Sequence, residues 1–113
     1  MKQQAGSMKA TIERIRNFNY ARDWDQFHSP ENLAKSVAIE AGELLECFQW
    51  SADFKQENVK QELADVLIYC TMLADKLGLD PLEIMNEKMS LNEQKYPVEK
   101  SRSSSKKYTE LGG

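Results

Sequence analysis

Residues 40–43, Glu-Ala-Gly-Glu, and residues 62–65, Glu-Leu-Ala-Asp, each place two acids three positions apart in a segment with helical periodicity. Side chains with this spacing lie on one face of a helix. If the two helices pack together, the four carboxylates meet, and their repulsion and desolvation are costly. A divalent cation offsets both costs, and Mg²⁺ prefers oxygen ligands and is readily shared with phosphates. The two pairs therefore predict a helical, magnesium-dependent enzyme that acts on a phosphate ester or anhydride.

Hydrophobic periodicity and helix-end signals predict an all-α chain with four helices, at residues 10–22, 30–50, 57–77 and 81–95. Ser29 and Asp80 are predicted N-caps, and each is followed by a proline at the first helical position. Gly78 is expected to end the third helix. The sequence shows no strand pattern, so we predict a four-helix bundle with a flexible C-terminal tail.

The length of 113 residues allows one domain, expected at 8–97, between an N-terminal extension attributed to cloning, 1–7, and a basic, serine-rich tail, 98–113. The net charge is −3, and the tail contributes +2, so the rest of the chain carries −5. This acidic body favours a small polyanionic ligand and argues against a nucleic-acid-binding face.

The cysteines and the apolar runs bear on the cellular compartment. Cys47 and Cys70 both lie on apolar helical stripes, so we expect core thiols in a reduced compartment. The apolar runs are short and interrupted by charges, unlike a membrane span. We therefore expect a cytoplasmic protein that binds neither nucleic acid nor membrane.

The position of Glu40 is unusual, because it falls inside the apolar stripe of the second helix, with Glu43 on the flank of that stripe. Acid pairs are common on exposed helices, but solvation does not explain an acid in a core-facing stripe. The third helix is apolar nearly all round, with Ile68 and Met72 away from its main stripe, which is typical of a bundle centre or a subunit interface. A di-iron site is the nearest rival, but it needs Glu-x-x-His motifs, and the single histidine lies outside both acid pairs.

The acid pairs and the short motifs around them resemble those of the MazG-like nucleoside triphosphate pyrophosphohydrolases, most closely their dCTP pyrophosphatase branch. The resemblance covers residues 11–111 and is carried by RDWDQFH (22–28), EAGEL (40–44), FQW (48–50), ELADVLIY (62–69) and KYPV (95–98). It implies an all-α fold and the cleavage of a (deoxy)nucleoside triphosphate between the α and β phosphates. The products would be the monophosphate and pyrophosphate, in the service of nucleotide-pool house-cleaning.

The resemblance also implies that Glu40, Glu43, Glu62 and Asp65 hold Mg²⁺, for which Mn²⁺ could substitute. The metal would neutralise phosphate charge and lower the pKa of a bound water. Glu43 is our candidate for the group that accepts the proton of that water, because Glu40 lies deeper in the stripe. Glu40 is the second catalytic candidate.

Candidate substrate contacts come from three parts of the chain. Trp24 and Trp50 match positions that flank the base in the family, and flat aromatic faces suit stacking, although both residues would equally suit a core or an interface. The others are His28, Tyr69, Lys88, Asn92, Tyr96, Arg102 and Lys107. Lys88, Asn92 and Tyr96 form one stripe at i, i+4 and i+8, where Lys88 would bind phosphate as a point charge.

Similar proteins assemble as dimers that pair into tetramers, so we expect a homotetramer, with the tail covering a neighbour's site. Two departures from the family pattern leave the base preference open: Ile15 stands where some members have a polar residue, and Ser103 stands where a glycine is common. Two other functions also remain open. One is a non-catalytic nucleotide-binding or regulatory module, and the other is a purely structural helical interaction module.

Overall fold

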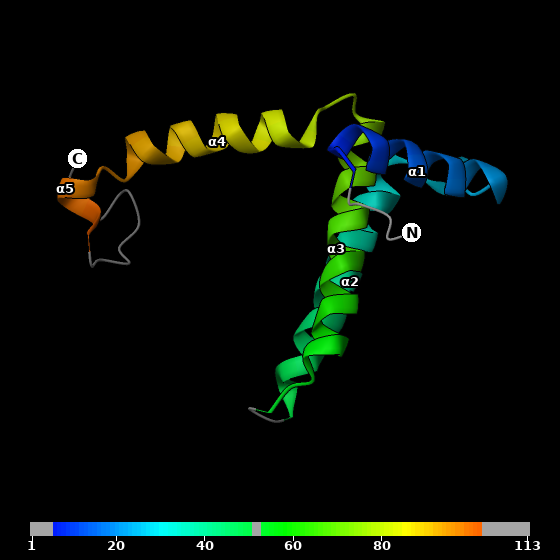
Figure 1. The fold of residues 1–113 in the computed structure, drawn as a ribbon, viewed down its shortest axis with the longest axis horizontal. Helices are drawn as coiled ribbons and strands as arrows, with labels where there is room; N and C mark the ends of the chain where they lie inside the picture. The colour runs from blue at the N-terminus through cyan, green and yellow to red at the C-terminus, as the bar shows by residue number, and fades with distance from the viewer. Residues whose placement is uncertain (1–5, 51–52, 103–113) are drawn as a thin grey trace. The chain divides into compact units, whose positions relative to one another are not determined.

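The computed structural model of the chain describes residues 6–50 and 53–102, and within these ranges it contains helices and no strand. The helices are α1 (Met8–Ala21), the 3₁₀ turn η1 (Asp25–Phe27), α2 (Pro30–Gln49), α3 (Gln56–Lys76), α4 (Pro81–Lys95) and α5 (Val98–Ser101) (Figure 1). The predicted all-α class is confirmed. Elements α1 to α3 form one unit, up to Leu79, and α4 and α5 belong to a second unit from Asp80 onward. Because α4 belongs to a different unit from α1, α2 and α3, the four-helix bundle stays a prediction.

The predicted helix ends are confirmed by their caps. Ser29 begins α2, because its hydroxyl oxygen accepts a hydrogen bond from the Asn32 N–H (3.1 Å). Asp80 begins α4, because its carboxylate accepts from the N–H groups of Leu82 (2.8 Å) and Glu83 (3.2 Å). Gly78 follows α3 with a φ of 72°, the left-handed region that a glycine enters without strain. Local sequence chemistry therefore sets where these helices start and stop.

Two short segments differ from the prediction. Residue Ser7, which was set aside as part of a cloning extension, caps α1 by accepting a hydrogen bond from the Ala10 N–H (3.1 Å). This cap explains why α1 begins at Met8, two residues earlier than predicted. The C-terminal tail begins with a helical turn, α5, because the carbonyl of Pro97 accepts from the N–H groups of Lys100 and Ser101. The flexibility of the tail stays a prediction, and residues 103–113 lie outside the described part.

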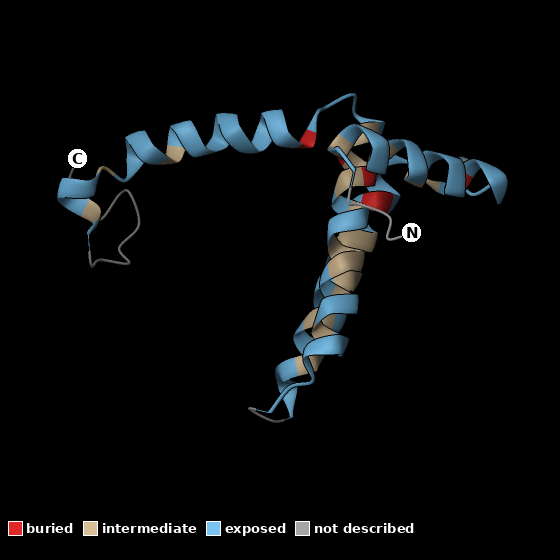
Figure 2. Ribbon diagram, viewed as in Figure 1, coloured by how far each residue is buried: buried red, intermediate tan, exposed pale blue. Residues whose placement is uncertain are grey.

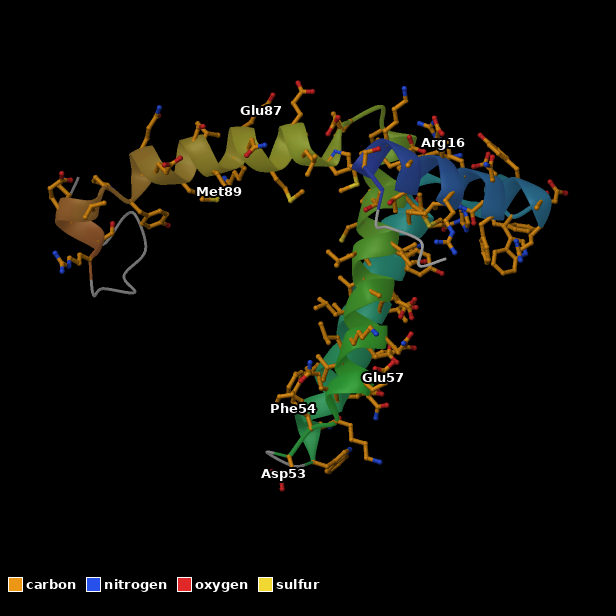
Figure 3. The ribbon with its side chains drawn as sticks, viewed as in Figure 1. Arg16, Asp53, Phe54, Glu57, Glu87 and Met89 are labelled. Atoms are coloured by element: carbon orange, nitrogen blue, oxygen red, sulfur yellow. The ribbon has the colours of Figure 1, made fainter. Side chains whose placement is uncertain are left out.

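Helices α2 and α3 pack side by side as an antiparallel pair, and α1 packs against α3 (Figure 1). The buried side chains of this unit, Asn19, Leu33, Met72 and Ala74, gather where α1 meets the pair (Figure 2). Met72, which lies away from the main stripe of the third helix, is buried because α1 covers that side of α3. Phe54 lies at the opposite end of the pair (Figure 3), and its ring centroid is 4.8 Å from that of Phe48.

Much of the predicted core surface is open in the single chain. Cys70, predicted to be a core thiol, is exposed, and Cys47 is only half-buried. Two antiparallel helices cover each other along one seam only, so stripe residues away from that seam stay in contact with solvent. No helix of the described residues is long and apolar enough to span a membrane.

Two ion pairs attach the N-terminal elements to α3. The guanidinium of Arg16 donates two hydrogen bonds to the Asp75 carboxylate, one of them from Nε at 2.9 Å. Lys76 Nζ lies 3.1 Å from Asp25 Oδ1 in η1. The Arg16 guanidinium holds the pKa of Asp75 below its ordinary value. The pairs fix α1 and the connector over the C-terminal half of α3, where a cavity forms.

Candidate active site

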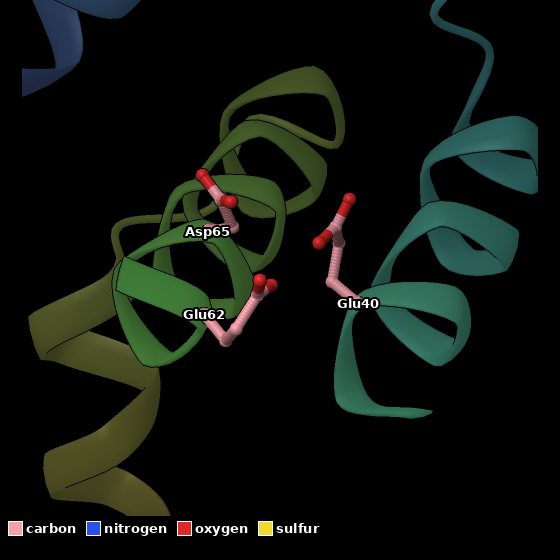
Figure 4. A group of neighbouring side chains, drawn as sticks. All are labelled: Glu40, Glu62 and Asp65. Atoms are coloured by element: carbon pink, nitrogen blue, oxygen red, sulfur yellow. The ribbon is translucent and has the colours of Figure 1, made fainter. Parts of the chain in front are cut away.

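Three carboxylates meet between α2 and α3. Glu40 on α2 faces Glu62 and Asp65 on α3, and one carboxylate oxygen from each of the three lies within 4.8 Å of the others (Figure 4). The i, i+3 spacing puts Glu62 and Asp65 on the same face of α3, and antiparallel packing brings the middle of α2 opposite that face. The structure thus brings together three of the four acids predicted to converge.

Glu43, the fourth predicted acid, lies outside this group of three oxygens and is exposed. It still acts on the group, because it forms a side-chain hydrogen bond with Glu40 and its charge acts on both Glu40 and Glu62. All four acids are therefore electrostatically connected, with Glu43 on the outer side.

The convergence of acids changes their protonation. The hydrogen bond with Glu43, then burial, then the charges of Glu43, Asp65 and Glu62 raise the pKa of Glu40 to about 7. The pKa of Glu62 is also raised, first by burial and then by the charges of Glu43 and Asp65. Both shifts have the sign expected when carboxylates share a site without a compensating positive charge.

Two oxygens of the cluster lack partners. Oε2 of Glu40 and Oε2 of Glu62 are buried, and neither accepts a hydrogen bond from any residue that the structure describes. An unpaired buried carboxylate oxygen is costly, and a cation is the group that satisfies several such oxygens at once. The donor set is oxygen only, which suits Mg²⁺ or Mn²⁺ and is a poor match for zinc sites rich in Cys and His. The acid cluster therefore fits a hard divalent cation.

A cavity of about 540 Å³ lies beside the acid cluster, between α1, the connector and α3. Its wall consists of Thr11, Arg14, Ile15, Phe18, Asn19, Trp24, His28, Asp65, Ile68, Tyr69 and Met72. Three of the candidate substrate contacts, Trp24, His28 and Tyr69, line it together. Asp65 belongs both to this wall and to the acid cluster, so the two features are continuous on α3.

Trp24 is held in the wall by the backbone around it. Asp23 adopts a φ of 55°, a left-handed conformation that Asp tolerates better than most residues, and this turn ends α1. The Trp24 N–H then donates to the carbonyl of Asn19 (2.9 Å). The Trp24 ring packs edge-on against Phe18, with centroids 5.6 Å apart and planes at 72°. The sequence motif Arg22-Asp23-Trp24 therefore places an aromatic ring in the cavity wall.

The remaining candidate contacts lie elsewhere. Trp50 is the C-cap of α2 and is 87% exposed, and it is not part of the cavity wall. Lys88 and Asn92 lie on α4 and Tyr96 caps its end, all in the second unit. Arg102 follows α5, and Lys107 lies outside the described residues. Within the first unit, the structure therefore brings Trp24, His28 and Tyr69 together in one wall and leaves Trp50 outside it.

Among the polar residues of the cavity wall, sequence reasoning missed Thr11, Arg14 and Asn19. In the sequence, Asn19 follows Ile15 by four residues and therefore shares a helical face with it, and a polar residue in an apolar stripe is the same signal that identified Glu40. Arg14 gave no such signal, because a charged residue on an exposed helical face is ordinary.

Comparison with known proteins finds relatives of this chain by sequence and by structure. The model of the MazG-like family matches residues 35–111. The dCTP pyrophosphatase 1 of Homo sapiens is 42% identical over 120 residues, which cover 93% of this chain and 70% of that protein, and the Mus musculus protein of the same name is 40% identical with the same coverage. A solved structure of a pyrophosphatase from Archaeoglobus fulgidus matches with a TM-score of 0.76 and 37% identity, over 86% of this chain and 98% of that one. This chain belongs to the MazG-like family.

Proposed function

We propose that this chain hydrolyses deoxynucleoside triphosphates to the monophosphate and pyrophosphate, with dCTP as a substrate. The relatives named dCTP pyrophosphatase and the pyrophosphatase of known structure support this class of reaction. One structural observation supports it independently: Asp65 lies both in the acid cluster and in the wall of the aromatic cavity. A triphosphate with a base needs two adjacent sites, one for the phosphates and one for the flat ring. Asp65 belongs both to the acid cluster, which suits the phosphates, and to the aromatic cavity, which suits the ring.

The acid cluster supplies the phosphate side. Glu40, Glu62 and Asp65 would hold a divalent cation, Mg²⁺ by preference, with Glu43 beside them. Such a cation neutralises phosphate charge and makes water a stronger acid. Glu43 is exposed and outside the group of three oxygens, and beyond its hydrogen bond with Glu40 the carboxylate has a second oxygen that could accept a proton from the attacking water. This position supports Glu43 as the general base.

The cavity supplies the nucleoside side. Trp24 offers a ring face for stacking, which contributes about 1–3 kcal/mol per base. Tyr69 and His28 line the same wall, and Arg14 adds a positive charge at its edge that favours the triphosphate. In the second unit, Lys88, Arg102 and Lys107 are proposed to bind phosphate, and Asn92 and Tyr96 are proposed as further substrate contacts.

The test is direct product analysis with dCTP, with and without Mg²⁺. Attack of water at the α phosphorus gives dCMP and pyrophosphate, whereas attack at the γ phosphorus gives dCDP and orthophosphate. We expect dCMP and pyrophosphate, no reaction after EDTA treatment, and recovery with Mg²⁺ or Mn²⁺. Orthophosphate as the direct product, in the absence of any added pyrophosphatase, would contradict the proposal. No product from any of the four deoxynucleotides would favour a non-catalytic binding module.

We also propose that the active form is a homo-oligomer, a tetramer built as a dimer of dimers. On the paired helices α2 and α3, Ile39 is 61% exposed, Leu45 67% and Leu67 59%. Burying such residues contributes about 1.5–3 kcal/mol each, so exposed apolar side chains of this kind favour association. In light scattering, a mass near the 13.0 kDa of one chain at micromolar concentration would refute the proposal.

A further inference from the structure

Two helices of the first unit end in the same backbone motif but with different residues. After α3, Gly78 has a φ of 72°, and its N–H donates to the carbonyl of Asp75 (3.0 Å). The next N–H, that of Leu79, donates to the carbonyl of Ala74 (2.8 Å). A left-handed residue with these two bonds is a Schellman motif, in which glycine is usual because it has no Cβ to clash. Such a helix end needs no side chain at the left-handed position.

Helix α1 ends in the same motif, with Asp23 in the place of the glycine. The Asp23 N–H donates to the carbonyl of Tyr20 (3.1 Å), and the Trp24 N–H donates to that of Asn19 (2.9 Å). Asp23 has a φ of 55° and, among the described residues, is the one residue other than glycine with a positive φ. A side chain is strained in this conformation, although Asp tolerates it better than most. Strain that a fold keeps points to a use for the side chain that causes it.

The side chain of Asp23 is bonded to Gln26. Gln26 Nε2 donates to Asp23 Oδ2 (2.9 Å) and also to the Asp23 carbonyl (3.0 Å). A carbonyl and a carboxylate are acceptors, so the amide nitrogen, which carries two hydrogens, is the atom of Gln26 that faces them. The two bonds close a ring that includes Trp24. A glycine at position 23 would keep the Schellman motif, but it would lose the carboxylate that ties the end of α1 to η1.

Trp24 depends on this turn for its position. Trp24 is 46% exposed, so packing, including the edge-on contact with Phe18, fixes its ring only in part. Both of its backbone polar groups are bonded, because its N–H donates to Asn19 and its carbonyl accepts from the Phe27 N–H (2.9 Å). The backbone of residues 23–26 therefore sets the direction in which the indole leaves the chain and enters the cavity wall.

We propose that Gln26 is a positioning residue for nucleotide binding. Its two hydrogen bonds hold Asp23 in the left-handed conformation and so keep Trp24 in the cavity wall before the substrate arrives. This inference rests on the proposed function, in which Trp24 stacks on the base. Gln26 is exposed and does not line the cavity, so it acts through Trp24. A contact that is already in place need not be ordered when the ligand binds, and apparent affinity falls with the fraction of molecules that are ready to bind.

The first measurement follows Trp24 directly. In a Trp50→Phe background Trp24 is the sole tryptophan of the chain, so its fluorescence anisotropy reports the motion of its ring. Gln26→Ala in this background should lower the anisotropy, because both donors are lost. Gln61→Ala is the matched control and should leave the anisotropy unchanged, since Gln61 Nε2 donates to Glu57 Oε1 (2.9 Å) on an exposed face of α3.

The second measurement is the affinity for the α,β-methylene analogue of dCTP, by calorimetry with Mg²⁺ and with Trp50 intact. We expect Gln26→Ala to weaken binding about 3- to 10-fold, as a fall of the binding-competent fraction to about 0.1–0.3 would produce. With dCTP itself the change should appear in KM, and kcat should stay within about twofold, because the acid cluster is untouched. Gln61→Ala should keep the affinity of the unchanged chain.

Two substitutions of Asp23 separate positioning from stability. Asp23→Gly adopts a φ of 55° without strain, so it should be at least as stable as the unchanged chain, yet it should bind the analogue about 3- to 10-fold more weakly. Asp23→Asn keeps an acceptor for Gln26 and tolerates the left-handed region, so it should bind within about twofold of the unchanged chain. Both variants lose the same negative charge, so a difference between them is not electrostatic.

The results separate this inference from the proposed function. Unchanged anisotropy or unchanged analogue affinity in Gln26→Ala overturns the role of Gln26, and so does equal binding by Asp23→Gly and Asp23→Asn. Because the analogue is not hydrolysed between the α and β phosphates, these outcomes do not depend on turnover. If dCTP releases no pyrophosphate while Gln26→Ala still loosens Trp24 and weakens analogue binding, the proposed function fails and the positioning role of Gln26 stands.

Discussion

The acid cluster and the aromatic cavity share helix α3 but differ in how they are built. The cluster needs only two helices, α2 and α3, with acids at i, i+3. The cavity needs a third element, because its wall draws residues from α1, the connector and α3. The position of the acids in the cluster follows from their helical spacing and from the packing of α2 on α3. The cavity also needs the turn at Asp23 and the two ion pairs that attach α1 and the connector to α3.

We therefore expect the cluster to serve the chemical step and the cavity to serve substrate binding. The cluster gathers negative charge that only a cation can compensate, so changes there should act on the reaction itself. The cavity presents Trp24 and Tyr69 beside that charge, so changes there should act on substrate affinity. Mutations in the two regions should therefore be distinguishable by whether kcat or KM changes.

The largest effect is expected from removing one charge of the cluster. Glu62→Gln keeps the shape of the side chain but weakens the cation site, and kcat/KM for dCTP should fall by about 100-fold or more, since even loss of a residue that only supports a metal ligand costs 10- to 100-fold. The fall should appear mainly in kcat. Glu57→Gln, an exposed acid in the first turn of the same helix, is the control and should remain within about twofold of the unchanged chain. Full activity of Glu62→Gln would remove the cluster from the catalytic site.

A smaller effect, on affinity, is expected in the cavity. Trp24→Ala removes the stacking face and should raise KM by about 10- to 100-fold, with a lesser change in kcat. Trp50→Ala is the informative comparison, because Trp50 is highly exposed in the single chain and is not part of the cavity wall. We expect it to raise KM less than Trp24→Ala does. Steady-state kinetics with dCTP would measure both, and an unchanged KM in Trp24→Ala would show that the base binds elsewhere.

The sequence predicted the cluster better than the cavity for a physical reason. Periodicity placed Glu40 inside an apolar stripe, and the structure shows it facing Glu62 and Asp65. Nothing local could show which element would cover Met72 or Asn19, because that depends on how α1 crosses α3. The helix ends were predictable because their signals are local, as at Ser29 and Asp80. Stripe residues such as Cys70 were wrongly assigned to the core because periodicity marks an apolar face and does not show what covers it.

The raised pKa values predict a pH dependence of stability that is specific to the cluster. The folded chain raises the pKa of Glu40 from an ordinary 4.5 to about 7, so between these values it binds more protons than the unfolded chain. Its contribution to stability is therefore complete below about pH 4.5 and is lost as the pH rises through 7. In EDTA, thermal unfolding should occur at lower temperature at pH 8 than at pH 5.

Glu40→Gln is the control for this pH dependence. Because the amide does not titrate, the unfolding temperature of this variant should change less between pH 5 and pH 8. Adding Mg²⁺ at pH 8 should restore much of the lost stability in the unchanged chain, since a cation that binds only the folded state stabilises it. In Glu40→Gln the gain from Mg²⁺ should be smaller. Equal pH curves for the two proteins in EDTA would show that Glu40 does not carry the shift.

The smallest effect is expected at Ser29, which lies between the two regions and starts the helix that carries Glu40. Its hydroxyl satisfies the Asn32 N–H, and loss of such a cap costs about 1 kcal/mol. Ser29→Ala should therefore lower the free energy of unfolding by about that amount in urea titrations, whereas Ser29→Asn keeps a capping oxygen and should stay near the unchanged chain. Because the rest of α2 still pairs with α3, kcat and KM should both change by less than about twofold. A large loss of kcat with intact folding would show that the acid cluster depends on the start of α2. The cluster would then not be fixed by the α2–α3 pairing alone, and the contrast drawn here with the cavity would be wrong.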